Sequence, residues 1–238
     1  MRQFSVEEIE RALLAKRDAE KAAIFKNHIG TKLDVLGVER KELLEILHAL
    51  QPLLPAAEEE FVWLNLLQDL WESDYFEARL IALELMFATE DLVDAHLWGM
   101  LDHWTNSLDN WVLADWLGHV RAVALAKAPG LVKRMAPWLR SRDVWRRRST
   151  LVSLVHLNPQ TFEERVLLET DDAFVFLEPV LNDAEISVQQ GLAWFLKRLR
   201  DKNPAAFEAL LTKAHKQIAP GVIQSLAKNE TAHTGAYA

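Results

Sequence analysis

Residues 109–157 decide the fold, and they read DNWVLADWLGHVRAVALAKAPGLVKRMAPWLRSRDVWRRRSTLVSLVHL. Apolar residues recur here at spacings of three and four, which is the pattern of a helix with one buried face. In the first helix the buried stripe is expected to hold Leu113, Trp116, Leu117 and Val120. Pro129 stands where a first helical turn would begin, and a short polar join at Ser141 and Arg142 separates the next two helices. Because short joins make successive helices antiparallel neighbours, the stretch predicts helices packed in pairs.

The same pattern continues over the rest of the chain, and no convincing two-residue alternation appears. Capping boxes at Ser5–Glu8 and Thr161–Glu164, and prolines 159, 204 and 220, indicate further helix starts. The expected helices cover residues 5–17, 18–28, 39–51, 58–72, 75–88, 90–104, 109–127, 130–140, 143–157, 160–169, 173–182, 185–201, 204–217 and 220–227. Paired helices of this length repeat roughly every 35–40 residues, as in HEAT-like repeats. The sequence predicts an all-α fold, an α-solenoid of stacked antiparallel helix pairs, with one domain over residues 1–228 and a flexible tail over 229–238.

Composition excludes several classes of protein and of chemistry. The chain of 238 residues is 50% hydrophobic and has no cysteine, so disulfide frameworks, thiolate zinc sites and cysteine nucleophiles are excluded. It has no apolar stretch long enough for a membrane helix, and the absence of cysteine fits a reducing compartment, so we expect a cytoplasmic protein. The eight histidines are dispersed and show no metal-ligand spacing, so we expect them to be surface or packing residues. We therefore expect no metal, no cofactor and no membrane partner, and a monomer.

Charge is divided unevenly along the chain. Residues 1–130 hold 12 Lys or Arg against 23 Asp or Glu, whereas residues 131–238 hold 15 against 12. Between Lys133 and Arg148 there are seven basic residues and one acid, Asp143. A polyanion docks where the local field is positive, so this run is a candidate nucleic-acid contact. The alternative is a solvated helix face, which is the usual meaning of a lone basic run.

Asp115 is the candidate catalytic residue. On the expected helix it lies one turn from Trp111, with Gly118 and Ala122 as small neighbours on its side. An acid beside an aromatic ring, over a floor of small residues, leaves room for a ligand to approach. The alternative is a core tryptophan and a solvated acid.

Two later segments combine tryptophan with basic residues. In the first, Trp145 and Arg148 share a helix face, and Arg147 lies next to them. In the second, Trp194 and Lys197 share a face, with Arg200 one turn on. The guanidinium group of arginine matches phosphate geometry, so Arg148, Arg147, Lys197, Arg200 and Trp145 are the candidate DNA-binding residues. Core tryptophans with solvated cations are the alternative. Inner helices of a solenoid would bring Trp111, Asp115, Arg148 and Trp194 into one groove.

These three segments resemble the AlkD family of bacterial DNA alkylation-repair glycosylases, which are HEAT-like repeat proteins of about this size. The resemblance rests on WVLAD at 111–115, WRRR at 145–148 and GLAWFLK at 191–197, and it covers nearly the whole chain, including KNH at 26–28 and GV at 37–38. By position it implies that Asp115, Trp111 and Trp194 form the reaction centre and that Arg148 contacts DNA. The sequence departs from the family at Ile24 and Phe25, where a tyrosine is expected, and at Lys197, where an arginine is expected.

The resemblance implies hydrolysis of the N-glycosidic bond of cationic N-alkylated purines, of the 3-methyladenine and 7-methylguanine type, in double-stranded DNA. A charged base is a good leaving group, so a carboxylate facing the sugar cation would suffice for catalysis, as in glycosidases. The resemblance further implies recognition without insertion of the base into a protein pocket. Two other functions stay open: a non-catalytic binder of DNA shape, and a protein-interaction scaffold that uses the acidic first half.

Overall fold

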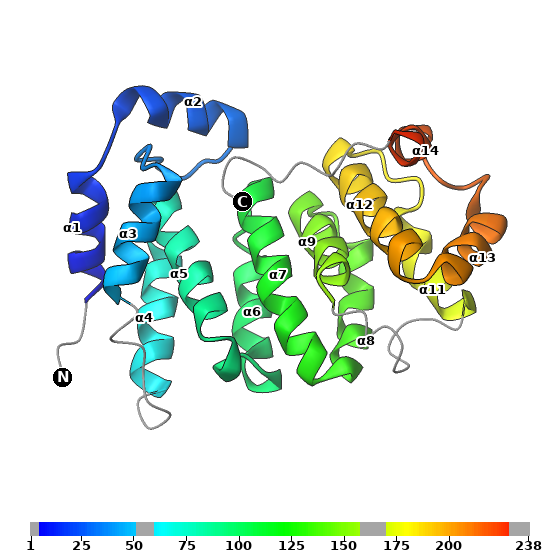
Figure 1. Ribbon diagram of the computed structural model, residues 1–238, viewed down its shortest axis with the longest axis horizontal. Helices are drawn as coiled ribbons and strands as arrows, with labels where there is room; N and C mark the ends of the chain where they lie inside the picture. Colours follow the sequence, from blue (N-terminus) through cyan, green and yellow to red (C-terminus); the bar gives the residue numbers. More distant parts are fainter. Residues whose placement is uncertain (1–4, 51–59, 158–169, 229–238) are drawn as a thin grey trace. The chain divides into compact units, whose positions relative to one another are not determined.

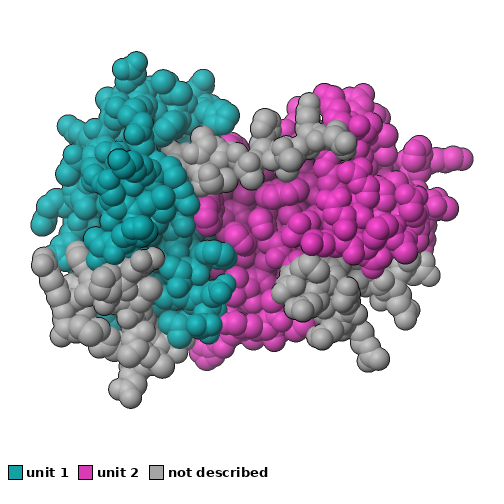
Figure 2. Space-filling view, viewed as in Figure 1, with its two compact units in different colours: residues 1–92, 235–238 teal, residues 93–234 magenta. Residues whose placement is uncertain are grey.

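The structure is a computed structural model, and it describes residues 5–50, 60–157 and 170–228. In these ranges there is no β-strand, and the one bridge found pairs Asp34 with Tyr75, so the predicted all-α class is confirmed. Figure 2 colours two compact units, residues 1–92 with 235–238 and residues 93–234. A single domain over 1–228 stays a prediction. The expected helix 160–169, the capping box at Thr161 and the tail 229–238 lie outside the described residues.

The first unit is built from α1 to α5. The five helices are α1 (Val6–Ala15), α2 (Ala19–Ile29), α3 (Arg40–Leu50), α4 (Glu60–Glu72) and α5 (Phe76–Ala88), followed by a 3₁₀ turn, η3 (Glu90–Leu92). The predicted capping box at Ser5 and Glu8 is present at the start of α1. The core lies around α5, which packs against α1, α3 and α4 and buries Phe76, Leu80 and Ile81 completely.

A buried carboxylate holds the loop between α2 and α3. Glu77 of α5 is fully buried, and its oxygens accept hydrogen bonds from the backbone N–H groups of Leu36 at 3.0 and 3.1 Å and of Gly37 at 2.8 Å. Burial raises the pKa of Glu77, and these backbone donors act against that rise. Gly37 has a φ of +78°, and a Cβ there would lie 2.3 Å from the carbonyl oxygen of Asp18. Only glycine therefore fits where this loop crosses the start of α2.

The second unit contains the three helices that carry every candidate residue named above, α7, α9 and α12. Its elements are η4 (Ala95–Leu97), α6 (Trp98–Thr105), α7 (Trp111–Lys127), η5 (Pro129–Leu131), α8 (Val132–Met135), η6 (Ala136–Arg140), α9 (Val144–Val155), α11 (Thr170–Leu177), η7 (Glu178–Val180), α12 (Ile186–Lys202), α13 (Pro204–Ala214) and α14 (Pro220–Ala227). Helix α9 packs against α7 on one side and α12 on the other, and Figure 1 shows the three in that order.

Most helix starts agree with the sequence, and the differences occur at local helix breakers. Pro204 and Pro220 are the first residues of α13 and α14, as expected. The expected helix 130–140 is divided into η5, α8 and η6, because Pro137 has no N–H to donate to the preceding turn. The expected helix 90–104 is also divided, and the side chain of Asp94 caps the N–H of His96 at 2.6 Å where η4 begins.

Candidate functional site

Asp115 and Arg148 form a two-pronged ion pair between α7 and α9. The Nε and Nη2 groups of Arg148 each donate to a different oxygen of Asp115, both at 2.7 Å. Its third nitrogen, Nη1, donates to the backbone carbonyl oxygen of Ser187 on α12 at 2.8 Å. The side chain of Arg148 is 8% exposed and that of Asp115 is 15% exposed. The side chain of Arg148 is therefore buried, and its hydrogen bonds connect its own helix, α9, to α7 and α12.

Two opposing effects set the protonation of Asp115. Burial raises the pKa of its carboxyl, while the hydrogen bonds and positive charge of Arg148 act in the opposite direction. Because both oxygens accept a charge-assisted hydrogen bond, the geometry is that of an ionised carboxylate. Arg148 thus keeps a negative charge at a place where burial alone would favour the neutral acid.

The surroundings of Asp115 on α7 differ in part from the prediction. Trp111 lies one turn before Asp115 and is half-buried, as a ring beside the carboxylate should be. Trp116, predicted to be core, is only half-buried. Gly118 does not leave space for a ligand, since a Cβ there would lie 2.9 Å from the Cβ of Val152. The small residue instead lets α9 approach α7 closely, and this approach brings Arg148 to Asp115.

A row of rings joins α7, the end of α9 and α12, and the sequence reasoning identified only one of its members, Trp194, as a candidate. We use "ring row" for Trp116, His119, His156 and Trp194, which come from α7, the end of α9 and α12. The imidazoles of His119 and His156 stack with centroids 4.0 Å apart, and Trp194 meets His156 edge-on at 5.2 Å. All four side chains are half-buried. Trp194, a candidate from the sequence, is thus joined through two histidines to Trp116, which the sequence placed in the core.

His156 is kept neutral in this row. Burial lowers its pKa to about 3, and the nearby charges of His119 and Arg198 add to the effect. A neutral imidazole at this position presents a π face and a polar edge without positive charge. The signal that identifies these histidines is spacing: His119 follows Asp115 by one helical turn, and His156 follows Arg148 by two turns.

The two arginines that precede Arg148 on α9 are also paired inside the protein. Arg147 donates to both oxygens of Asp183 at 2.6 and 3.0 Å and to the carbonyl oxygen of Ser141 at 2.7 Å. Arg146 pairs with Asp102 and with the side chain of Asn106. The side chain of Arg147 is 11% exposed, so its predicted place among the DNA contacts is not supported by its geometry.

The remaining candidates lie on the outer parts of the same helices. Trp145 is half-buried in the first turn of α9, and Lys197 is half-buried on α12. Arg200 reaches towards α14, where its Nη1 lies 3.4 Å from the carbonyl oxygen of Leu226, and its Nε lies 3.9 Å from Asp201. The structure thus joins Asp115 with Arg148 directly, whereas Arg200 points to a different neighbour.

Three comparisons with known proteins bear on the family and the fold of the chain. A sequence profile of the family described as DNA alkylation repair enzyme matches residues 9–227. The chain belongs to the DNA alkylation repair enzyme family. Its fold is similar to a solved structure titled "Predicted DNA alkylation repair enzyme from Enterococcus faecalis", with a TM-score of 0.74 and 13% identity over 90% of this chain and 96% of that chain. No curated protein matches the sequence. The predicted family and its HEAT-like all-α fold are confirmed.

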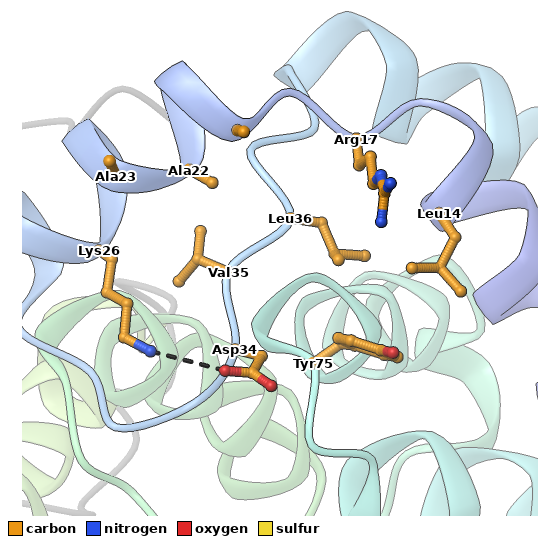
Figure 3. Close-up of a pocket in the computed structure, with 10 residues that line it drawn as sticks. Leu14, Arg17, Ala22, Ala23, Lys26, Asp34, Val35, Leu36 and Tyr75 are labelled. Carbon is orange, nitrogen blue, oxygen red and sulfur yellow. Dashed lines mark ion pairs between the residues drawn. The ribbon is translucent and has the colours of Figure 1, made fainter.

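In this member of the DNA alkylation repair enzyme family, a hollow lies within the first unit. It measures about 570 Å³ and is formed by α1, α2, the following loop and the start of α5. Figure 3 shows Lys26 reaching Asp34 at one end, with Nζ 3.6 Å from the carboxylate, and Arg17 and Leu14 at the other. Tyr75 and Leu36 lie between them. None of the candidate catalytic residues lines this hollow.

The described residues contain neither a metal-binding cluster nor a membrane-spanning helix. Residues 5–50, 60–157 and 170–228 hold no cluster of three His, Asp, Glu or Cys side chains that would bind a metal ion. In the same ranges, no helix has the length and hydropathy needed to span a bilayer.

Proposed function

We propose that this protein is a DNA glycosylase that hydrolyses the N-glycosidic bond of cationic N-alkylated purines, of the 3-methyladenine and 7-methylguanine type, in double-stranded DNA. The observation that carries the proposal is the Asp115 carboxylate, held by two hydrogen bonds at 2.7 Å, with Trp111 one helical turn before it and His119 of the ring row one turn after it on α7. Membership of the DNA alkylation repair enzyme family supports it. Asp115 is the catalytic residue of this proposal, and Arg148 is the residue that positions it.

The chemistry needs no acid on the leaving group. In an alkylated purine the base nitrogen carries a positive charge, so the electron pair of the breaking C1′–N bond neutralises the base as it leaves. The sugar becomes an oxocarbenium-like cation, and a water oxygen then bonds to C1′ and loses its proton. A carboxylate facing this cation stabilises it, as in glycosidases, by about 3–4 kcal/mol for one preorganised group. Asp115 fills this role and accepts a hydrogen bond from the attacking water.

The rings contribute through their π faces. Trp111 and Trp194 attract the positive charge shared by the base and the sugar, with on the order of 0.5–2 kcal/mol for each ring. A charged histidine in the row would repel the same cation. The low pKa of His156 keeps this side chain neutral, which suits a cationic substrate.

One observation favours the non-catalytic alternative. Both oxygens of Asp115 are engaged by Arg148, so much of the carboxylate charge is compensated inside the protein. A DNA binder without hydrolase activity would need Asp115 and Arg148 only as a helix-joining pair. In that case binding to DNA should depend on salt, and no base should be released.

The experiment that separates the two functions is release of free base. Alkylated duplex DNA is incubated with the wild-type protein and with Asp115→Asn, and released 3-methyladenine and 7-methylguanine are measured. The glycosylase proposal expects release by the wild type and a rate at least about 100-fold lower for Asp115→Asn, because the variant removes the negative charge that stabilises the sugar cation.

Glu208→Gln is the matched control, since Glu208 is an exposed carboxylate on α13. Its rate should equal that of the wild type. Urea unfolding of all three proteins separates a loss of chemistry from a loss of fold. The proposal is wrong if the wild type releases neither base, or if folded Asp115→Asn releases them as fast as the wild type.

A further inference from the structure

The three adjacent arginines of α9, two of which the sequence assigned to DNA binding, are engaged inside the protein. Arg146, Arg147 and Arg148 each pair with an acidic side chain of the same unit. A phosphate that bound Arg148 would have to displace Asp115 from two hydrogen bonds, and would leave that carboxylate without a partner. If this unit binds DNA, another cation must contact the phosphate beside the reaction centre.

Arg198 has the position and freedom that this contact requires. It lies on α12 one helical turn after Trp194, so the two side chains leave the helix on the same side. Its positive charge helps to lower the pKa of His156, which places the guanidinium near the ring row from a second, independent observation. The side chain is exposed, and among the residues that the structure describes it has no hydrogen-bond or ion-pair partner.

The ring row and an unpaired cation together suit a nucleic acid. Proteins that bind unstacked or strained nucleic acid combine π faces, on which bases or sugars rest, with a cation on the phosphate. Here the faces come from α7, α9 and α12, and the cation stands at the α12 end of the row.

We propose that Arg198, and not Arg148, makes the phosphate contact next to the reaction centre, so that the DNA backbone follows the ring row. The inference rests on the proposed function for the identity of the ligand, DNA. It assigns the phosphate to a side chain outside the three tryptophan-containing segments that carry the family resemblance.

The test is the salt dependence of DNA binding. A fluorescent duplex with one alkylated purine is titrated with wild type, Arg198→Ala and Arg198→Lys at several salt concentrations. Arg198→Ala should bind about threefold to tenfold more weakly, and the slope of log K against log salt should fall by about 0.9, which is one phosphate contact. Arg198→Lys keeps the charge and should restore the slope.

Lys216→Ala is the matched control, because Lys216 is also an exposed cation but follows α13, outside α7, α9 and α12. Its slope should equal that of the wild type. The inference is overturned if Arg198→Ala keeps the wild-type slope, or if Lys216→Ala lowers it equally. This result is distinct from failure of the glycosylase proposal: binding can lose one phosphate contact in a protein that releases no base, and base release can persist with an unchanged slope.

Discussion

Replacement of Arg148 by alanine tests whether this arginine holds the protein together or waits for DNA. Arg148→Ala removes two hydrogen bonds to Asp115 at 2.7 Å and one to the carbonyl oxygen of Ser187 at 2.8 Å. It leaves a carboxylate with only 15% of its side chain exposed and no counterion. Removing one partner of a buried pair costs 3–5 kcal/mol, and the partial exposure of Asp115 places the expected loss near the lower end, at about 3 kcal/mol.

The measurement is urea unfolding followed by far-UV circular dichroism, without DNA. Arg134→Ala removes an exposed arginine of α8 and is the control, so its unfolding free energy should stay within about 0.5 kcal/mol of that of the wild type. In the double variant Asp115→Asn with Arg148→Ala no charge is left unpaired, so about 1–2 kcal/mol of the loss should return. A loss below about 1 kcal/mol for Arg148→Ala would refute the reasoning, and would mean that the arginine is available to a phosphate in the free protein.

Three further predictions concern close packing and pH. Gly37→Ala should lose at least about 3 kcal/mol of unfolding free energy, because its Cβ would lie 2.3 Å from a backbone oxygen. Gly30→Ala is the control: Gly30 has a similar φ and no atom within 4 Å of the added Cβ, so this variant should lose about 1 kcal/mol. Equal losses in the two variants would contradict the prediction. Gly118→Ala should destabilise by about 2 kcal/mol and slow base release, while Gly191→Ala, with its nearest contact at 3.6 Å, should do neither in the same two assays. His156 has a pKa of about 3 in the fold and an ordinary value of 6.5 in the unfolded chain. The unfolded chain therefore binds more protons between these values, and stability falls as the pH falls. From about pH 7 to pH 5 this group accounts for roughly 2 kcal/mol, and an unchanged pH slope in His156→Phe would show that the reasoning is wrong.

The sequence predicted the helices well, because helix signals are local. Apolar spacing, capping boxes and prolines identify where helices begin, and Ser5, Pro204 and Pro220 do so in the structure. Breaks inside expected helices were missed at Pro137 and Asp94, where a missing donor or a competing side-chain acceptor changes the local hydrogen bonds.

The candidate site was predicted only in part, because local sequence patterns do not show which side chains of neighbouring helices come into contact. Spacing predicted Trp111 one helical turn before Asp115, and both residues lie on α7 as expected. The partner of each arginine depends on how far α9 slides against its neighbours, and the small residue Gly118 sets that distance. Three adjacent arginines therefore looked like one patch, although each turns to a different acid. The stacking of His119 on His156 depends on the same register between helices, so the sequence did not predict it either.

The inward-facing arginines of α9 also affect how the protein meets its ligand. A guanidinium that is matched by a carboxylate within hydrogen-bonding distance contributes almost nothing to the potential several Debye lengths away. Helix α9 therefore provides no strongly positive patch, and the formal net charge of −8 determines the sign of the field at long range. Encounter with a polyanion should then proceed near the unassisted rate of about 10⁵–10⁶ M⁻¹s⁻¹, and the protein would gain its hold on a damaged nucleotide after contact, through slow departure and not through fast capture.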